Sequence, residues 1–247
     1  MIKKILISQP KPTAENSPYF STAEKLGIEM VFRPFIKVER VSVREFRDQR
    51  INILDYTAVV FTSRHAIDFF FQMCQDLRVT IPATMKYFCI TETVALYIQK
   101  YIQYRKRKIF FGSTGQIADL MPLMTKHSSE RFFIPQSEVH KKDFALLLEK
   151  NKLNYKEGIM YRTVSNDFTP DESFDYDMIV FFSPSGVQAF KKNFPQFTQG
   201  DVAVACLGPA TAKAVEEAGL TLHIEAPTKE YPSILSAITA YVKKVNG

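Results

Sequence analysis

The chain of 247 residues is long enough for two domains, and its hydrophobic content of 46% excludes a disordered or low-complexity protein. The formal net charge of +6 fits an anionic partner but does not by itself require one. The three cysteines, Cys74, Cys89 and Cys206, lie far apart among apolar residues, which excludes a paired metal motif and favours buried free thiols in a reducing compartment.

Two further patterns concern the cellular location. The N-terminal stretch MIKKILISQP has two lysines and then an apolar run that is too short for the core of a signal peptide. No apolar run approaches the roughly 18 residues that a membrane span requires. We therefore expect a cytoplasmic protein that makes no contact with a membrane.

Short apolar runs alternate with helical patterns along the chain. Ile5–Ile7 is typical of a strand buried on both faces, and Asn16-Ser17-Pro18 predicts a capped helix that ends at Gly27. Because strands alternate with helices, we predict an α/β fold of parallel sheets flanked by helices. The other predicted strands are Ile28–Phe35, Ala58–Phe61, Tyr87–Ile90, Lys108–Phe111, Phe132–Ile134, Gly158–Tyr161, Met178–Phe182, Val202–Leu207 and Leu222–Ile224.

The two halves of the chain also repeat each other. FTSRHAI matches FFSPSGV with Ser63 opposite Ser183, and FFGSTGQIADLM matches IEAPTKEYPSIL with Thr114 opposite Thr228. FCITETVALYI matches ACLGPATAKAV, ILISQ matches FFIPQ, and VFRP matches MYRT. A general likeness of α/β halves would not place the same loop residues at a nearly constant offset. We therefore predict two copies of one α/β unit, with Phe35–Val43 and Tyr161–Pro170 as extended crossings between them.

Hydroxyl-bearing residues and glycines follow the predicted strands where helices begin. In a parallel sheet these positions lie at the carboxyl ends of the strands, where helix N–H groups and hydroxyls can bind carboxylates or phosphates. The simpler alternative is that these residues only cap helices, and both roles can hold at once. The candidate binding residues are Thr62, Ser63, Thr93, Ser113, Thr114, Ser183, Ser185, Gly186, Gly208, Thr211 and Thr228.

The motifs that are missing restrict the chemistry. The sequence has no glycine-rich dinucleotide loop, no Walker-type loop, no nucleophile elbow and no cluster of histidines. His65, beside Ser63, is either a base or a solvated residue of a helix start. Without a pair of catalytic acids, such a protein either binds a ligand or guides a reaction that is already nearly spontaneous.

Three stretches, FFSPSGV, ACLGPATAKAVEEAGL and EAPTKEYPSIL, together resemble the uroporphyrinogen-III synthase family of tetrapyrrole biosynthesis. FTSRHAI is similar to that family's first-half counterpart, and MYRT to its strand-end tyrosine motif. The resemblance implies two similar flavodoxin-like α/β domains joined by a two-stranded connector. The first domain would comprise residues 1–35 and 165–247, the second would comprise 38–162, and the crossings would fall near 35–38 and 162–165.

The resemblance also implies the chemistry. The substrate would be hydroxymethylbilane, a linear tetrapyrrole with acetate and propionate on every ring. The enzyme would remove water, invert the last ring and close the macrocycle to uroporphyrinogen III. Hydroxyls and helix N-termini suit the carboxylates, and holding the flexible substrate in one shape lowers the entropic barrier. The resemblance implies no cofactor and no metal, and we expect a monomer that contacts the preceding pathway enzyme only transiently.

Tyr161, in the motif MYRT, is the candidate for assisting departure of the substrate hydroxyl, because a phenolic O–H donates hydrogen bonds at neutral pH. The alternative is a strand-end tyrosine that packs at the crossing. One loop departs from the family pattern, since Thr91 replaces a glycine and Val94 a threonine. We expect Thr93 to supply the hydroxyl there.

Other interpretations stay open. Arg64 and Lys229 lie beside matched positions and are either partners of carboxylates or solvated charges. A non-enzymatic two-domain binder of small anionic ligands would use the same candidate residues. The stretch YIQYRKRK, residues 101–108, would bind RNA or form an ordinary helix end and loop, and we favour the loop and expect no nucleic-acid partner.

Overall fold

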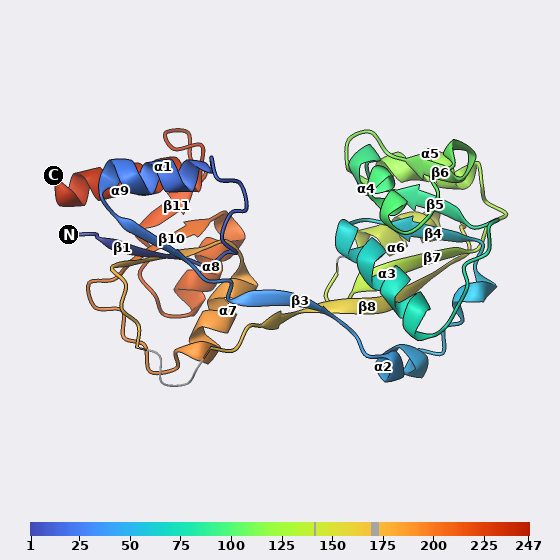
Figure 1. The fold of residues 1–247 in the computed structure, drawn as a ribbon, viewed down its shortest axis with the longest axis horizontal. Helices are drawn as coiled ribbons and strands as arrows, with labels where there is room; N and C mark the ends of the chain where they lie inside the picture. The colour runs from blue at the N-terminus through green and yellow to red at the C-terminus, as the bar shows by residue number, and fades with distance from the viewer. Residues whose placement is uncertain (141, 169–172) are drawn as a thin grey trace. The chain divides into compact units, whose positions relative to one another are not determined.

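The computed structural model describes residues 1–140, 142–168 and 173–247, so the last residues of the predicted crossing Tyr161–Pro170 lie outside the described residues. The chain divides into two compact units. Unit 1 comprises Met1–Lys37 and Val164–Gly247, and unit 2 comprises Val38–Thr163. The chain therefore leaves unit 1 after Lys37 and returns to it after Thr163 (Figure 1).

Unit 1 is built on a sheet in the order β11-β10-β9-β1-β2, and every neighbouring pair of strands is parallel. Its strands are β1 (Lys4–Ile7), β2 (Glu29–Phe32), β9 (Met178–Phe181), β10 (Ala203–Leu207) and β11 (Ile224–Ala226). Its helices are α1 (Pro18–Leu26), α7 (Pro184–Asn193), α8 (Pro209–Glu217) and α9 (Ile234–Asn246).

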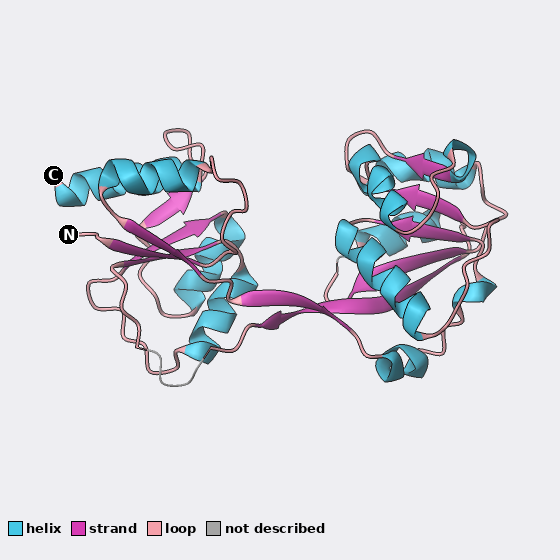
Figure 2. Cartoon of the chain, in the orientation of Figure 1, coloured by secondary structure: helices cyan, strands magenta, loops and turns pink. Residues whose placement is uncertain are grey.

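Helices cover both faces of this sheet because its central strands are apolar on both sides. All four residues of β9 are buried, and successive side chains point to opposite faces. Met178 and Val180 pack in a core with Ile238 of α9, whereas Ile179 packs in a second core with Phe190 of α7. Within unit 1, α1 and α9 cover one face of the sheet, and α7 and α8 cover the other (Figure 2).

Unit 2 contains a sheet in the order β3-β8-β7-β4-β5-β6, in which the strands from β8 to β6 are parallel. Its strands are β3 (Ile36–Arg40), β4 (Ala58–Phe61), β5 (Lys86–Cys89), β6 (Ile109–Phe111), β7 (Phe132–Ser137) and β8 (Tyr155–Ser165). Its α-helices are α2 (Val43–Asp48), α3 (Arg64–Asp76), α4 (Glu92–Tyr97), α5 (Met121–Thr125) and α6 (Asp143–Lys150). Short 3-10 turns are η1 (Ile53–Asp55), η2 (Ile98–Lys100), η3 (Lys106–Lys108) and η4 (Ile117–Leu120).

The two parallel sheets have the same strand order. When β7, β8, β4, β5 and β6 are set against β1, β2, β9, β10 and β11, the two orders coincide, which agrees with the repeat in the sequence. The prediction of parallel sheets flanked by helices is confirmed. In this topology, ligands bind at the carboxyl ends of the two strands where the winding reverses, which are β1 and β9 in unit 1 and β7 and β4 in unit 2.

Four predicted strands differ from the structure by two or more residues at an end. Phe132–Ile134 is only the first half of β7, which continues to Ser137 beside β8. Ile28–Phe35 was expected as one strand, but β2 ends at Phe32, before Arg33-Pro34, where proline cannot donate a ladder hydrogen bond. Gly158–Tyr161 is only the middle of the longer β8, which has a neighbouring strand on each side. Leu222–Ile224 is displaced to β11, because Ile224–Ala226 is the segment that pairs with β10.

None of the helices in the described ranges combines the length and the apolar character that crossing a membrane would require.

Candidate functional site at the carboxyl ends of the strands

In unit 2 the structure brings Ser63 and Tyr161 together. Ser63 follows β4 and is the N-cap residue of α3, where its Oγ accepts a hydrogen bond of 3.1 Å from the Ala66 backbone N–H. Tyr161 is aligned with Ser137 at the end of β7, so its side chain reaches the same edge of the sheet. The Tyr161 hydroxyl lies 3.5 Å from Ser63 Oγ. The candidate proton donor and one candidate binding hydroxyl are therefore neighbours, although they are far apart in the sequence.

An aromatic stack holds the Tyr161 ring. The ring lies on Phe69 of α3, with 5.4 Å between ring centroids and an interplanar angle of 29°. Phe69 stacks in turn on His65, with 6.0 Å between centroids. His65 is exposed in the first turn of α3. Because α3 carries both Ser63 at its cap and Phe69 two turns later, one helix fixes the ring and the neighbour of its hydroxyl.

The loop after β6 binds a carboxylate of the protein itself. Asp119 Oδ2 accepts hydrogen bonds of 2.6 Å from both the backbone N–H and the hydroxyl of Thr114, and longer ones from Ser113. The Thr114 hydroxyl is the main cause of the lowered pKa of the Asp119 carboxyl. Gly112 permits this approach, because a Cβ there would lie 2.9 Å from that of Asp119. The donors predicted for a substrate carboxylate are thus engaged by Asp119.

In unit 1 the loop after β9 gathers hydroxyls at the start of α7. Ser183 Oγ accepts a hydrogen bond of 3.1 Å from the Gly186 N–H and lies 3.3 Å from Ser185 Oγ. Gly186 is buried, and a Cβ there would lie 3.4 Å from Ser183 Oγ and 4.0 Å from Ser8 Oγ. Ser8, which is only 8% exposed, directly follows β1. These serines therefore meet where the winding of the sheet reverses.

The loops after β5 and β10 differ in backbone shape. Gly208 has φ 83° and ψ 154°, a conformation that only glycine adopts readily, and its N–H donates to the Ala226 carbonyl at 2.7 Å. Thr91, at the matching position, has φ −142°, and its hydroxyl caps α4 by accepting from the Val94 N–H at 3.3 Å. Thr93 is exposed in the first turn of α4, whereas Thr211, in α8, is 3% exposed.

Thr228 differs from its counterpart Thr114. Its N–H donates to the Tyr231 carbonyl and its hydroxyl accepts from the Tyr231 N–H, both at 2.9 Å. A hydroxyl that accepts one hydrogen bond can still donate another. Thr228 and Lys229 line a pocket of about 590 Å³ together with Tyr241 and Lys244. At the position that matches Asp119, unit 1 has a serine that caps α9 instead of a carboxylate.

Thr62, Arg64 and Lys229 are the remaining residues that the sequence indicated. Thr62 lies between β4 and Ser63 and is half-buried. The Arg64 guanidinium lies over the ring of Tyr97, 5.3 Å from its centroid, and the Tyr97 hydroxyl donates to Asp68 at 2.9 Å. Lys229 is exposed.

Sequence reasoning missed Arg162, which follows Tyr161 in β8. Its guanidinium donates a hydrogen bond to Glu45, which lowers the pKa of that carboxyl to about 2. Arg162 Nε is buried, has no hydrogen-bond partner among the described residues, and lies 3.8 Å from Glu138 Oε2. The matched stretches VFRP and MYRT carried a signal, because arginine occupies the same position in both.

Within the described parts of the chain, no group of histidine, cysteine or acidic side chains is arranged to hold a metal ion.

The chain is similar to known proteins in both sequence and structure. A family model described as uroporphyrinogen-III synthase HemD matches residues 17–236. The solved uroporphyrinogen-III synthetase of Helicobacter pylori is 14% identical with a TM-score of 0.60, over 98% of this chain and 100% of that one. A mutant uroporphyrinogen III synthase from Thermus thermophilus is 15% identical with a TM-score of 0.52, over 99% of each chain. At these identities the solved structures establish likeness of fold. The curated proteins contain no match.

Proposed function

The chain belongs to the uroporphyrinogen-III synthase family, and on this premise we propose that it converts hydroxymethylbilane into uroporphyrinogen III. It is thus a cyclising enzyme of the lyase class, which removes water and inverts the last pyrrole ring as it closes the macrocycle in tetrapyrrole biosynthesis. The observation that carries this conclusion is the match of the family model to residues 17–236, which extends over most of both units.

The substrate carries a carboxylate on every acetate and propionate, so binding it requires many hydrogen-bond donors. Ser183 and Ser185 at the start of α7, and Ser63 at the start of α3, offer hydroxyls beside the N–H groups of helix ends. The positive end of each helix dipole favours an anion there. We propose that these edges bind the substrate carboxylates and so hold the flexible chain in the shape that closes correctly.

Of the two matched threonines, we favour Thr228 as the stronger ligand of a carboxylate. The N–H and hydroxyl of Thr114 already donate to Asp119, and a substrate carboxylate would have to displace that charged group. Thr228 has no acidic counterpart at the matched position, and Lys229 follows it in a pocket wall. This asymmetry supports unequal contributions of the Thr114 and Thr228 loops.

We propose Tyr161 as the acid that assists departure of the substrate hydroxyl. As the C–O bond breaks, Tyr161 Oη gives its proton to the leaving hydroxyl, which departs as water. The tyrosinate then takes up the proton that the substrate releases on ring closure, so the enzyme returns to its starting state. Stacking on Phe69 holds the phenol ring in one orientation, which is what a proton donor requires.

We further propose that the two compact units are the two domains of the enzyme, and that it acts in the cytoplasm as a monomer with only transient contact with the preceding pathway enzyme. Gel filtration with light scattering measures the molar mass in solution, and the mass of a dimer would contradict the proposed monomer.

An isomer assay tests the function. Hydroxymethylbilane is generated in situ, the protein is added, the products are oxidised, and the type III and type I isomers are separated by chromatography. Without control by an enzyme, the released cation closes on the uninverted ring and gives type I. Predominant type III product establishes the cyclase. Type I product alone, with or without the protein, would reject it and favour the non-enzymatic binder of anions.

A further inference from the structure

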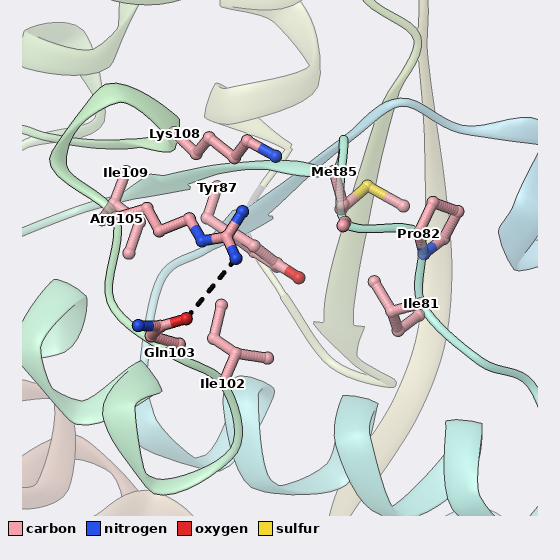
Figure 3. A pocket seen from close by; sticks show the side chains of 10 residues that line it. Ile81, Pro82, Met85, Tyr87, Ile102, Gln103, Arg105, Lys108 and Ile109 are labelled. Atoms are coloured by element: carbon pink, nitrogen blue, oxygen red, sulfur yellow. Dashed lines mark hydrogen bonds between the residues drawn. The ribbon is translucent and has the colours of Figure 1, made fainter.

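A cavity of about 220 Å³ lies in unit 2 at the amino ends of β5 and β6 (Figure 3). Met85 directly precedes β5, and Ile109 is the first residue of β6, and both line it. The candidate residues Thr93 and Ser113 follow the carboxyl ends of the same two strands. Because a strand of four residues spans about 13 Å, a ligand in this cavity would lie a full strand length away from them.

The apolar part of the cavity lining comes from the sheet and from the loops that precede its strands. Tyr87 and Ile109 are partners in the register of β5 and β6, and each is 4% exposed. The other apolar lining residues are Ile81, Pro82, Ala83, Met85 and Ile102. Because Tyr87 and Ile109 are paired strand residues of the hydrophobic core, the sheet fixes their part of the lining.

Two cations stand at the same cavity. Arg105 and Lys108 line it, and Figure 3 shows their charged ends directed toward the space between the apolar side chains. Neither forms an ion pair with a carboxylate in the described ranges of the chain, and Arg105 donates only a long hydrogen bond of 3.4 Å to Gln103. Partial burial, and then the charges of Arg105 and Arg107, lower the pKa of Lys108. An anion at this position would relieve that repulsion.

We propose that this cavity is a binding site for a small organic acid with a flat apolar body and a single carboxylate. The carboxylate would lie between the Arg105 guanidinium and the Lys108 ammonium, and the body would lie against Ile81, Met85 and Tyr87. An inorganic anion would use the cations but would leave the apolar wall in water, which gives up the hydrophobic part of the binding free energy. A nucleic-acid chain presents successive phosphates, whereas two of the residues that line this cavity, Arg105 and Lys108, are cationic.

Titration calorimetry with 2-naphthoate tests the proposal on the intact chain. The variant Arg105→Gln/Lys108→Gln removes both cations from the cavity. The variant Lys106→Gln/Arg107→Gln is the matched control, because it removes the same charge from the same segment, at residues that do not line the cavity. Neutral 2-naphthamide, with the same ring system, separates the contribution of the carboxylate, and thermal melting confirms that both variants fold.

We expect saturable binding of 2-naphthoate to the wild type and a loss of about tenfold or more in the Arg105→Gln/Lys108→Gln variant. The control variant should bind within about threefold of wild type, and 2-naphthamide should bind at least about tenfold more weakly than 2-naphthoate. Equal losses in the two variants, equal binding of the amide, or no binding of 2-naphthoate at millimolar concentration would each overturn the proposal. The readout is binding alone, so it does not depend on the proposed cyclase activity.

Discussion

Replacing Tyr161 by phenylalanine removes one oxygen atom from the candidate site and leaves the ring in place. The stacking on Phe69, with 5.4 Å between centroids, does not involve the hydroxyl. The hydroxyl itself lies 3.5 Å from Ser63 Oγ, at the outer limit of a hydrogen bond. We therefore expect Tyr161→Phe to change the free energy of unfolding by less than about 1 kcal/mol.

The effect on turnover should be much larger. Donation of a proton to a leaving group contributes about 100-fold or more to a rate, which corresponds to about 2.7 kcal/mol of barrier. We expect kcat of Tyr161→Phe to fall by about that factor. The product should still be mainly type III, because the groups that would hold the carboxylates are unchanged. The assay is the isomer assay run as a time course, with urea unfolding of the same preparation.

Tyr155→Phe is the matched control. Tyr155 is the first residue of the same strand, β8, and its hydroxyl donates to Glu149 at 3.1 Å, away from Ser63. This variant should retain wild-type turnover. If Tyr161→Phe turned over within about twofold of wild type, the phenol would not be the proton donor. A shift of its product toward type I would instead assign Tyr161 to holding the substrate.

Three further predictions concern a cap, the thiols and an ion pair. Aspartate and asparagine cap helices equally well, so the variants Ser183→Asp and Ser183→Asn should melt at similar temperatures. The KM of Ser183→Asp should be about tenfold higher than that of Ser183→Asn, because the aspartate repels the substrate carboxylates. Equal KM values would mean that Ser183 only caps the helix. Burial raises the pKa of Cys74 to about 12 and that of Cys206 to about 11, and Cys89 is buried as well. All three thiols should therefore resist a disulfide reagent at pH 8 until the protein is denatured. Rapid labelling of the native protein would contradict their burial. Burial opposes ionisation of Glu130, but the hydrogen bond of 2.6 Å from Lys86 holds the pKa of Glu130 below its ordinary value. The ion pair between Glu130 and Lys86 therefore contributes its full stability above the unfolded pKa of glutamate, near 4.3, and loses it as pH falls further. The loss of unfolding free energy in Glu130→Gln, about 1 kcal/mol at pH 7, should shrink below pH 4.5 in urea titrations. A loss that is independent of pH would refute the assignment.

Much of the fold could be read from local patterns. Ala58–Phe61 was predicted as a strand and is β4 with the same bounds, because an apolar run of this length is stable only with a helix layer on each face. The repeat also predicted equivalent turns. Ser63 and Ser183 both cap a helix by accepting from the N–H three residues later, each at 3.1 Å. A cap depends on neighbouring residues alone, which is why the sequence indicates it well.

Strand ends that are set by a neighbouring strand were harder to predict. β11 pairs with β10 two residues later than its apolar pattern suggested, because the register with a neighbouring strand decides which residues extend the sheet. The long β8 likewise depends on having a neighbour on each side in the sheet. These features are set by partners that are distant in the sequence.

The sequence by itself determined the parallel sheets, the helix caps, the repeat and the family resemblance, because each depends on the composition, spacing or order of short segments. Only the tertiary structure decided that Tyr161 lies beside Ser63, that Asp119 engages the donors of Thr114, and that Arg105 and Lys108 stand over an apolar cavity. Each of these contacts depends on strand order and on the direction of individual side chains. Residues brought together in this way carry no common local signal, because packing of the whole unit sets the distance between them.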